Sequence, residues 1–396
     1  MLNSKSLLYI TGADFIVRSA YQMGKTPLLP IFASYLGAEA AFLGFIVSVS
    51  TLTGMVLKPL VGVLSDRWGR RSWLIVGTIF FVVMPFLYQF VSTPEQLFYI
   101  RIIHGFATAI YGPVTLAYVA EISTTRRAER LGWFGFARNG GYIVGPAVAG
   151  WMLLVTTPAS VFTVIGIVSI FAFLPIIFLP EKSRSNQRTT TPIIRQVITS
   201  IMSGSRTSTV WVAGALEGTM FISLYSVRTF LPLLALNAGF NIGIAGTFFA
   251  VQEAIHLIAN PLGGRLGDKI GYRSIIPLGI LFMSLSLPLI TVGNNIVILF
   301  TAAAIIGVAQ ACVFPSTLTL VSNSMGRDSI GTGLGLLGTL KNAGKVVGPT
   351  ISGAMIHWIG YNLTFQIMAL TLILVAILII KPPDFLKSHF KSQALQ

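Results

Sequence analysis

Ionic side chains lie inside long apolar segments of this chain, where they are its best candidates for chemistry. The first segment carries a polar stripe at spacings of four, four and three residues, which places on one helix face Asp14, Arg18, Gln22 and Lys25. Asp14 and Arg18 are spaced to pair, and a carboxylate beside a cation can bind and release a proton as its surroundings change. The stripe therefore predicts either the wall of a binding cavity or an internal salt bridge that only stabilises the helices.

Two further apolar segments carry buried acids. Glu217 shares its segment with Tyr225 and Arg228, and Glu253 lies near the middle of the next one, with His256 one turn later as a candidate relay. A charge inside a bilayer costs at least about 2.5 kcal/mol, so such residues are expected to face a protein interior and to be functional. We expect a substrate cavity lined by Arg18, Gln22, Lys25, Tyr225, Arg228, Arg138, Lys341 and Lys345.

The composition is that of a membrane protein. The chain has 396 residues, of which 54% are hydrophobic and 10% are charged, whereas a soluble domain carries about 25% charged residues. The net charge of +15 does not indicate nucleic-acid binding, because the basic residues lie between apolar segments rather than on one solvated face. The single cysteine, Cys312, excludes an intramolecular disulfide and a cysteine-rich metal site. The sequence shows no metal cluster, phosphate loop or nucleophile triad, so we expect neither an enzyme nor a cofactor.

Stretches of about 20 mostly apolar residues are long enough to cross a bilayer as helices. We expect an all-α protein with twelve such spans, because helices satisfy the backbone hydrogen bonds that lipid cannot. They lie near 7–32, 41–63, 73–92, 96–121, 132–155, 159–179, 209–235, 242–264, 274–293, 295–322, 331–356 and 361–380. We expect the first span to be retained rather than cleaved as a signal.

Lys and Arg residues fall on alternate connections between these spans. The connections near 33–40, 93–95, 156–158, 236–241 and 357–360 hold neither residue. The positive-inside rule then places both termini in the cytoplasm of a plasma-membrane protein. The long basic connection 181–206 would be a cytoplasmic linker, either a flexible tether or an amphipathic surface helix. It divides the chain into six-helix bundles at 1–180 and 207–380, followed by a cytoplasmic tail at 381–396.

The two halves of the chain are copies of one another. RNGGYIVGPAVAG at 138–150 aligns with KNAGKVVGPTISG at 341–353, at an offset of 203. Asp14 falls on Glu217 at the same offset, and Asp66 falls on Asp268 at 202. Because six spans separate the copies, both run in the same direction, which is a parallel repeat of the kind found in secondary transporters.

Three motifs carry a family resemblance. They read Gly62-x-x-x-Asp66-Arg67-x-Gly69-Arg70-Arg71 after the second span, Arg101-x-x-His104-Gly105 in the fourth, and Gly141-x-x-x-Gly145-Pro146-x-x-Ala149-Gly150 in the fifth. The first two resemble signatures of the major facilitator superfamily. The third resembles the motif of its drug:proton antiporters, which usually have glycine where this chain has Ala149.

The resemblance implies roles for these residues. The first motif and its copy at 264–273 would latch the two halves in the outward-facing state through Gly62, Asp66, Gly69, Arg70, Arg71 and Asp268. The arginines could also serve topology alone. Arg101 and His104 would tune a proton-coupling carboxylate among Asp14, Glu217 and Glu253. Close packing between the halves, or ordinary small-residue packing, would involve Gly141, Gly145, Pro146, Gly150, Gly344, Gly348, Pro349 and Gly353.

The resemblance implies a proton-coupled exporter of a drug or metabolite that works by alternating access, driven by the proton gradient without a bound cofactor or metal. Its partners would be a small-molecule substrate, protons and the lipid bilayer, with no nucleic acid, and it would act as a monomer. The alternative is a transporter of an anionic solute or lipid head group with the same fold, which could be an importer. The excess of cations over acids within the spans favours this alternative. A membrane enzyme or a receptor has no support in the sequence.

Overall fold

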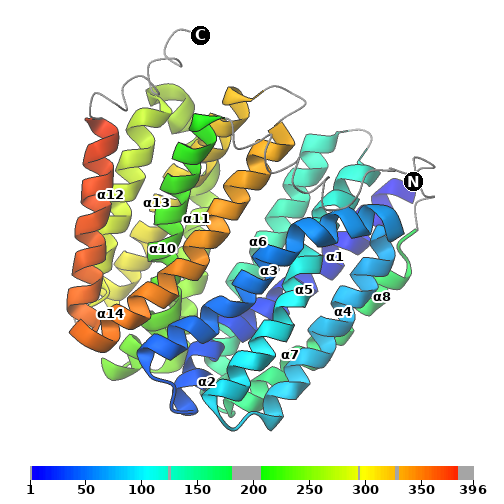
Figure 1. Ribbon diagram of the computed structural model, residues 1–396, viewed down its shortest axis with the longest axis horizontal. Coiled ribbons are helices and arrows are strands. Elements are labelled where there is room, and N and C mark those ends of the chain that lie inside the picture. Colours follow the sequence, from blue (N-terminus) through cyan, green and yellow to red (C-terminus); the bar gives the residue numbers. More distant parts are fainter. Residues whose placement is uncertain (1, 124–125, 181–206, 293–294, 326–329, 382–396) are drawn as a thin grey trace. The chain divides into compact units, whose positions relative to one another are not determined.

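The computed structural model describes residues 2–123, 126–180, 207–292, 295–325 and 330–381, and these ranges contain helices and turns but no strand. The chain divides into two compact units, drawn in Figure 1. Unit 1 comprises Met1–Val197 with Arg228–Ala250, and unit 2 comprises Ile198–Val227 with Val251–Gln396. The all-helical class expected from the sequence is confirmed. The linker 181–206 and nearly all of the tail lie outside the described residues, so the six-helix bundles proposed on either side of the linker stay a prediction.

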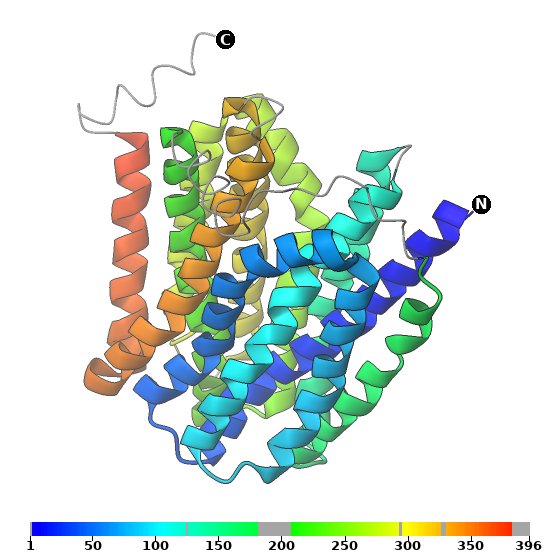
Figure 2. The same ribbon diagram turned by 45° about the vertical axis from the view of Figure 1, so that its right-hand side comes forward.

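The helices follow the expected apolar segments. The first copy of the repeat contains α1 (Leu2–Met23), the π-helical turn η1 (Gly24–Leu28), α2 (Leu29–Tyr35), α3 (Ala40–Trp68), α4 (Arg70–Leu87), the 3-10 turn η2 (Tyr88–Phe90), α5 (Pro94–Ile122), α6 (Arg127–Met152), α7 (Pro158–Ile170) and α8 (Phe173–Ile177). The second contains α10 (Ser208–Asn237), α11 (Ile242–Ile270), α12 (Tyr272–Leu289), α13 (Ile296–Ser324) and α14 (Ile330–Ile380). In unit 1, α3 lies along α5 in both views (Figures 1 and 2).

Local side chains and glycines set the helix ends. The Thr93 hydroxyl accepts a hydrogen bond from the backbone N–H of Gln96 at the start of α5, and the Asn295 side chain accepts from the first N–H groups of α13. Gly69 separates α3 from α4 with a φ of 94°, and Gly271 separates α11 from α12 with a φ of 86°. Backbone angles of this kind favour glycine. The two glycines occupy equivalent positions of the repeat, so the copies share this turn as well as their helices.

Nine helical stretches among the described residues are long and apolar enough to cross a membrane. The helices α1 and α6, which carry Asp14 and Arg138, are not among them. The expected spans 331–356 and 361–380 both lie in α14, which is interrupted at Gly360 by a non-helical backbone with a φ of 75°. The first expected span is broken at Thr26, whose backbone is extended before Pro27. Twelve crossings, and the cytoplasmic location of both termini, therefore stay predictions.

The glycines of α6 bring that helix into backbone contact with α1. A Cβ atom built on Gly145 would lie 2.7 Å from the carbonyl oxygen of Ser19 and 2.7 Å from the Cβ of Gln22. Gly141 packs in the same way against Arg18. We expected these glycines to form a contact between the two halves of the chain. Gly141 and Gly145 instead pack against α1 of their own repeat, because a helix without side chains on one face approaches the neighbour that its own bundle provides.

In the second repeat, glycines likewise bring α14 into backbone contact with α10. A Cβ on Gly344 would lie 2.3 Å from the carbonyl oxygen of Gly218, and one on Gly348 would lie 2.3 Å from that of Ile222. Gly353 is also buried. Glycine packing between the first and the fifth apolar segment is therefore a shared property of the two copies.

Gly150 and Gly62, two other glycines of the motifs, differ in how closely other helices approach them. In unit 1, a Cβ on Gly150 would lie 2.8 Å from the Cα of Gly246 in α11, and Pro146 places its carbonyl oxygen 2.4 Å from the Cβ position of Gly246. Gly62, by contrast, has no described atom within 4 Å of its Cβ position. Gly62 therefore makes no close helix contact among the described residues, because that side of α3 has no neighbour within this distance.

Candidate functional site

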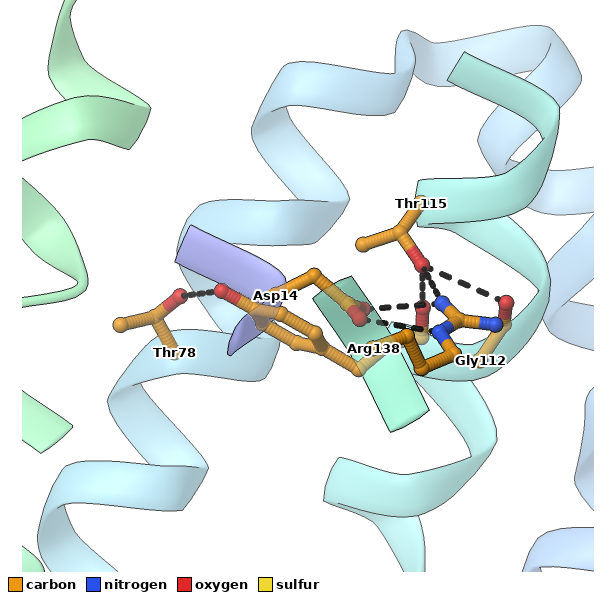
Figure 3. A network of polar contacts seen from close by, with 6 residues as sticks. Asp14, Thr78, Gly112, Thr115 and Arg138 are labelled. Atoms are coloured by element: carbon orange, nitrogen blue, oxygen red, sulfur yellow. Dashed lines mark hydrogen bonds and ion pairs between the residues drawn. The ribbon is translucent and has the colours of Figure 1, made fainter. Parts of the chain in front are cut away.

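Asp14 and Arg138 form a buried ion pair in unit 1 (Figure 3). Arg138 donates from Nε to Asp14 Oδ2 at 2.9 Å and from Nη2 to Asp14 Oδ1 at 2.8 Å. The same Nη2 donates to the Thr115 hydroxyl at 2.6 Å, which in turn donates to the carbonyl oxygen of Tyr111. Asp14 is 1% exposed. Three helices, α1, α5 and α6, therefore hold one carboxylate through a bidentate, charge-assisted pair.

The sequence spacing suggested Arg18 as the partner of Asp14, and the bidentate partner is Arg138 of another helix. Arg18 lies with its guanidinium carbon 5.8 Å from the centroid of the Tyr142 ring. Arg228 lies at 5.8 Å from the same centroid. Tyr142 thus contacts two guanidinium groups of unit 1 that the sequence assigned to a cavity.

Unit 2 repeats this site with a looser pair. The Lys341 ammonium lies 3.4 Å from Glu217 Oε1, and the Thr317 hydroxyl lies 3.5 Å from Glu217 Oε2. Glu217 and Lys341 stand 203 positions after Asp14 and Arg138, and Thr317 stands 202 after Thr115. Sequence reasoning found both carboxylates and both cations but missed the two threonines. The threonines could have been identified from the sequence, because they are separated by 202 residues, which is close to the offset between the two copies.

The two pairs differ in the geometry of their contacts and in the exposure of the cation. Arg138 presents a planar fork that matches both oxygens of Asp14, and its side chain is 19% exposed. Lys341 makes one longer contact and its side chain is 36% exposed, while Glu217 is 4% exposed. A single contact from a partly solvated ammonium is lost more easily than two short bonds. Glu217 is therefore held less tightly by its cation than Asp14 is.

Aromatic rings surround the ion pair of unit 2. The Phe221 and Phe314 rings stack in parallel, with centroids 4.7 Å apart and an interplanar angle of 3°. The Lys341 ammonium lies 5.0 Å from the Phe221 centroid. The Lys345 ammonium lies 4.7 Å from the Phe221 centroid and 5.4 Å from that of Tyr225. Two lysines one helical turn apart therefore share one phenyl ring.

Glu253 and His256 lie together in α11 of unit 2. His256 Nδ1 is 3.1 Å from Glu253 Oε1, and the His256 ring stands edge-on to Phe314 at 5.7 Å. The side-chain amide of Gln252 donates to Glu253 Oε2 at 3.4 Å and also to Gln310. The spacing that suggested a relay does produce a carboxylate–imidazole contact. This contact joins the aromatic cluster through Phe314.

Arg101 and His104 form a different network, in unit 1. Arg101, 2% exposed, donates to the hydroxyls of Ser50 and Tyr88, and the Tyr88 hydroxyl lies 3.0 Å from His104 Nδ1. Tyr88 therefore links the two residues, and sequence reasoning missed it. The contacts shown for Arg101 are to hydroxyl groups rather than to the carboxylates that it was expected to tune.

Two remaining cavity candidates lie near these networks. Lys25 donates to the hydroxyl of Thr51 at 3.2 Å, and its ammonium lies 5.6 Å from the ring centroid of Tyr21. Gln22 is buried beneath Gly145 in the contact between α1 and α6. Gln22 is thus part of a packed helix interface.

The motif between α3 and α4 forms an ionic cluster within unit 1. Arg70 pairs with Asp66 and with Glu121 of α5, each at 2.5 Å. Arg71 donates to the carbonyl oxygen of Ile177 at 2.7 Å. Glu121 was missed because it is far from the motif in sequence.

In the copy of this motif in the second repeat, Asp268 corresponds to Asp66 but has a different partner. In unit 2, Asp268 accepts a hydrogen bond from the Tyr272 hydroxyl at 2.6 Å. Across the part of the chain that the structure describes, no group of three or more His, Cys, Asp or Glu residues is placed to hold a metal ion.

The chain matches one protein family along most of its length. The description of that family is Major Facilitator Superfamily, and the matched residues are 15–255 and 215–395. The chain therefore belongs to this superfamily and is a multi-pass membrane transporter. The resemblance carried by the three motifs is confirmed.

Relatives with printed functions include resistance proteins. Multidrug resistance protein 1 of Bacillus subtilis is 25% identical over 376 residues, which cover 91% of this chain and 93% of that protein. Quinolone resistance protein NorA of Staphylococcus aureus is 23% identical over 336 residues, covering 83% and 84%. An uncharacterized MFS-type transporter of Methanocaldococcus jannaschii is 25% identical over 357 residues, covering 89% and 92%.

Solved structures agree on the fold. The nucleoside transporter NupG superposes with a TM-score of 0.79 at 14% identity, covering 98% of this chain and 99% of that one. A POT family transporter in complex with 5-aminolevulinic acid superposes with a TM-score of 0.77 at 13% identity, covering 94% and 95%. At such identities the likeness concerns architecture and not substrate.

Proposed function

We propose that this superfamily member is a proton-coupled secondary active transporter that exports a drug or metabolite in exchange for protons, by alternating access. The observation that carries the proposal is the buried carboxylate of Glu217, which one 3.4 Å contact holds to the Lys341 ammonium. A proton on Glu217 removes its charge and releases Lys341, which changes the charge of the site in a single step. Asp14 would need to give up two short bonds to Arg138, so Glu217 is the principal coupling residue and Asp14 the secondary one.

The outward direction is supported by the relatives. The similar proteins of Bacillus subtilis and Staphylococcus aureus are named for resistance to drugs. Resistance to a drug can result from its export, and an inward proton gradient would drive such export. We therefore assign the small-molecule substrate to the class of drugs or metabolites.

The other networks take supporting roles in this proposal. Glu253 with His256 would provide a second proton site in unit 2, beside Phe314. Arg101 and His104, joined by Tyr88, would set the local electrostatic potential in unit 1. The ionic cluster around Arg70 would act as a conformational latch, with Asp66 exchanging partners as access alternates.

A transport assay tests the proton assignment. Everted membrane vesicles with an acidic lumen are expected to take up ethidium when they contain the parent protein. Glu217→Gln should abolish this uptake, and Asp14→Asn should reduce it, while Glu95→Gln, at an exposed acid at the start of α5, should leave it unchanged. If Glu217→Gln and Asp14→Asn both retain full gradient-driven uptake, the proton assignment is wrong.

A second candidate function is transport of an anionic solute or a lipid head group, inward or outward. It is favoured by the cations of unit 1, among them the buried Lys25 and the two half-buried guanidinium groups on Tyr142. Under this reading, Arg18→Ala, Lys25→Ala or Arg228→Ala should remove the binding of anionic compounds and leave neutral ones unaffected. Equal losses for anionic and neutral compounds would contradict it.

A further inference from the structure

We propose that the Thr317 hydroxyl in unit 2 accepts a hydrogen bond from protonated Glu217, and that this bond raises the pH at which the carboxylate takes up its proton. The inference rests on the proposed function, because it concerns the carboxylate to which that function assigns the proton. It adds a residue that the sequence did not single out, and it assigns that residue to the protonated state of the site.

The two carboxylate oxygens of Glu217 have different partners. Oε1 lies 3.4 Å from the Lys341 ammonium, and Oε2 lies 3.5 Å from the Thr317 hydroxyl. Glu217 and Thr317 are both buried, so water is scarce around them. An ammonium group carries donors and no acceptor, whereas a hydroxyl oxygen can accept. Of these two partners, Thr317 is therefore the one that can bind a proton carried by Glu217.

The hydroxyl proton of Thr317 has closer acceptors than Glu217. The hydroxyl oxygen lies 3.1 Å from the carbonyl oxygens of Val313 and of Phe314. A hydroxyl has one proton to donate and two lone pairs that accept, and threonine in a helix commonly donates to a carbonyl of the preceding turn. A hydroxyl that donates to an ionised carboxylate stands at about 2.5–2.7 Å. The longer distance to Glu217 indicates that the proton of Thr317 stays with its own helix, which leaves a lone pair for a proton on Oε2.

The first copy uses the equivalent threonine differently. Thr115 stands 202 positions before Thr317. Its hydroxyl accepts from Arg138 Nη2 at 2.6 Å and donates to the carbonyl oxygen of Tyr111 at 2.6 Å (Figure 3). In the described part of the chain, the Thr317 hydroxyl receives no hydrogen bond from a cation. Thr115 therefore supports an ionised pair, whereas Thr317 keeps its acceptor for a neutral carboxyl group.

The proposed step conserves every proton. A proton from water binds to Oε2 of Glu217, the new O–H group donates to the oxygen of Thr317, and Thr317 keeps its own proton on the carbonyl oxygen of Val313. The carboxyl group then no longer attracts the Lys341 ammonium, and release of the proton reverses the sequence. Because the hydrogen bond stabilises only the neutral form, the parent should take up the proton at a higher pH than a variant without the hydroxyl.

Other ionisable groups of unit 2 also influence Glu217. Among the described residues, those of the ion pair and of the aromatic cluster around it are Tyr225 of α10, Glu253 and His256 of α11, and Lys341 and Lys345 of α14. An uncharged substitution at Thr317 alters the charge of none of them. A shift in the pH of proton uptake in such a variant therefore reports the hydrogen bond of Thr317.

Infrared difference spectroscopy of the purified full-length protein in detergent tests the inference. A protonated carboxyl group absorbs in a band that an ionised carboxylate lacks, and the part of this band that Glu217→Gln removes belongs to Glu217. Titration of that part gives the midpoint pH of proton uptake. Thr317→Val replaces the hydroxyl by a methyl group and should lower the midpoint by about 0.5–1 pH unit. Thr317→Ser keeps the hydroxyl and should keep the midpoint of the parent.

Two further threonine variants serve as controls. Thr301→Val removes a hydroxyl that donates to the carbonyl oxygen of Val297 at 2.8 Å, at an exposed position of α13. Thr115→Val removes the equivalent hydroxyl of the first copy. Both should leave the midpoint of Glu217 unchanged. Thermal unfolding verifies that each variant is folded. Thr317→Cys, whose thiol is a weak acceptor, should lower the midpoint as well and takes the place of the valine variant if that one is unfolded.

The outcomes separate this inference from the proposed function. An unchanged or higher midpoint in Thr317→Val overturns the inference, even if Glu217→Gln abolishes gradient-driven ethidium uptake. If the midpoint falls as expected while Glu217→Gln retains full uptake, the hydrogen bond stands and the proposed proton coupling fails. If Glu217→Gln removes no part of the band at any pH, Glu217 takes up no proton and both proposals fail.

Discussion

The carboxylate of Asp14 accepts hydrogen bonds from Arg138 at 2.8 and 2.9 Å, although 124 residues separate the two in the chain. The equivalent residues of the second copy, Glu217 and Lys341, make a single contact at 3.4 Å. The two copies therefore hold sites of the same design, and the site with Glu and Lys in place of Asp and Arg is the looser one. This difference is the physical basis for giving the two carboxylates unequal roles.

The tight pair should contribute more to stability than the loose one. Removal of one partner from a buried ion pair typically costs about 3–5 kcal/mol, because the other charge is left without compensation. Asp14→Asn should therefore lower the midpoint of thermal unfolding clearly more than Glu217→Gln does. Intrinsic tryptophan fluorescence of the purified protein measures both midpoints. A loss in Glu217→Gln as large as that in Asp14→Asn would contradict the distinction.

Glycine packing should be equally sensitive in both copies. Gly145→Ala and Gly348→Ala each place a methyl group against backbone atoms less than 3 Å away, and overpacking of this kind costs about 1–3 kcal/mol. The matched control is Gly335→Ala in α14, where the Cβ position has no described atom within 4 Å. We expect both packing variants to unfold at lower temperature than the control. If both variants unfold at the same temperature as the parent, the helices can move apart without a loss of stability.

The turn glycines should matter through their backbone angles rather than through packing. Gly69 and Gly271 have φ values of 94° and 86° with an open Cβ position. A side chain in such a region costs about 1–3 kcal/mol. Gly69→Ala and Gly271→Ala should therefore be destabilising, whereas Gly62→Ala, inside α3 with open space around it, should be neutral or stabilising by up to about 1 kcal/mol. Thermal unfolding distinguishes the two classes.

The Arg70 cluster should affect transport more than stability. Asp66 and Glu121 are 51% and 38% exposed, and ion pairs of exposed groups contribute about 0–1 kcal/mol. Asp66→Asn and Glu121→Gln should each lower the initial rate of gradient-driven ethidium uptake several-fold, because both acids position Arg70 in the proposed latch. Unfolding midpoints should stay close to that of the parent. Parent-like uptake rates for both variants would show that the arginines serve topology alone.

The helical class, the approximate positions of the apolar segments, the duplication and the family could all be predicted from the amino-acid sequence. Each of these depends on hydropathy, spacing or repeated residues, which are local or periodic properties of a chain. Both carboxylates of the ion pairs were identified in the same way, since a charge in an apolar segment is conspicuous. Thr115 and Thr317 could also have been identified, because they occupy equivalent positions in the two copies.

Which side chains contact one another could not be predicted from the sequence, because it depends on how the helices pack. Asp14 and Arg18 are neighbours on one helix, yet the bidentate partner of Asp14 comes from α6, because Gly141 and Gly145 bring that helix into contact with α1. Glu121 reaches Arg70 across the packing of α4 on α5 in the same manner. Spacing along a helix limits which residues share a face. Helix packing then decides which of them find a partner, because it sets distances between residues that are far apart in the chain.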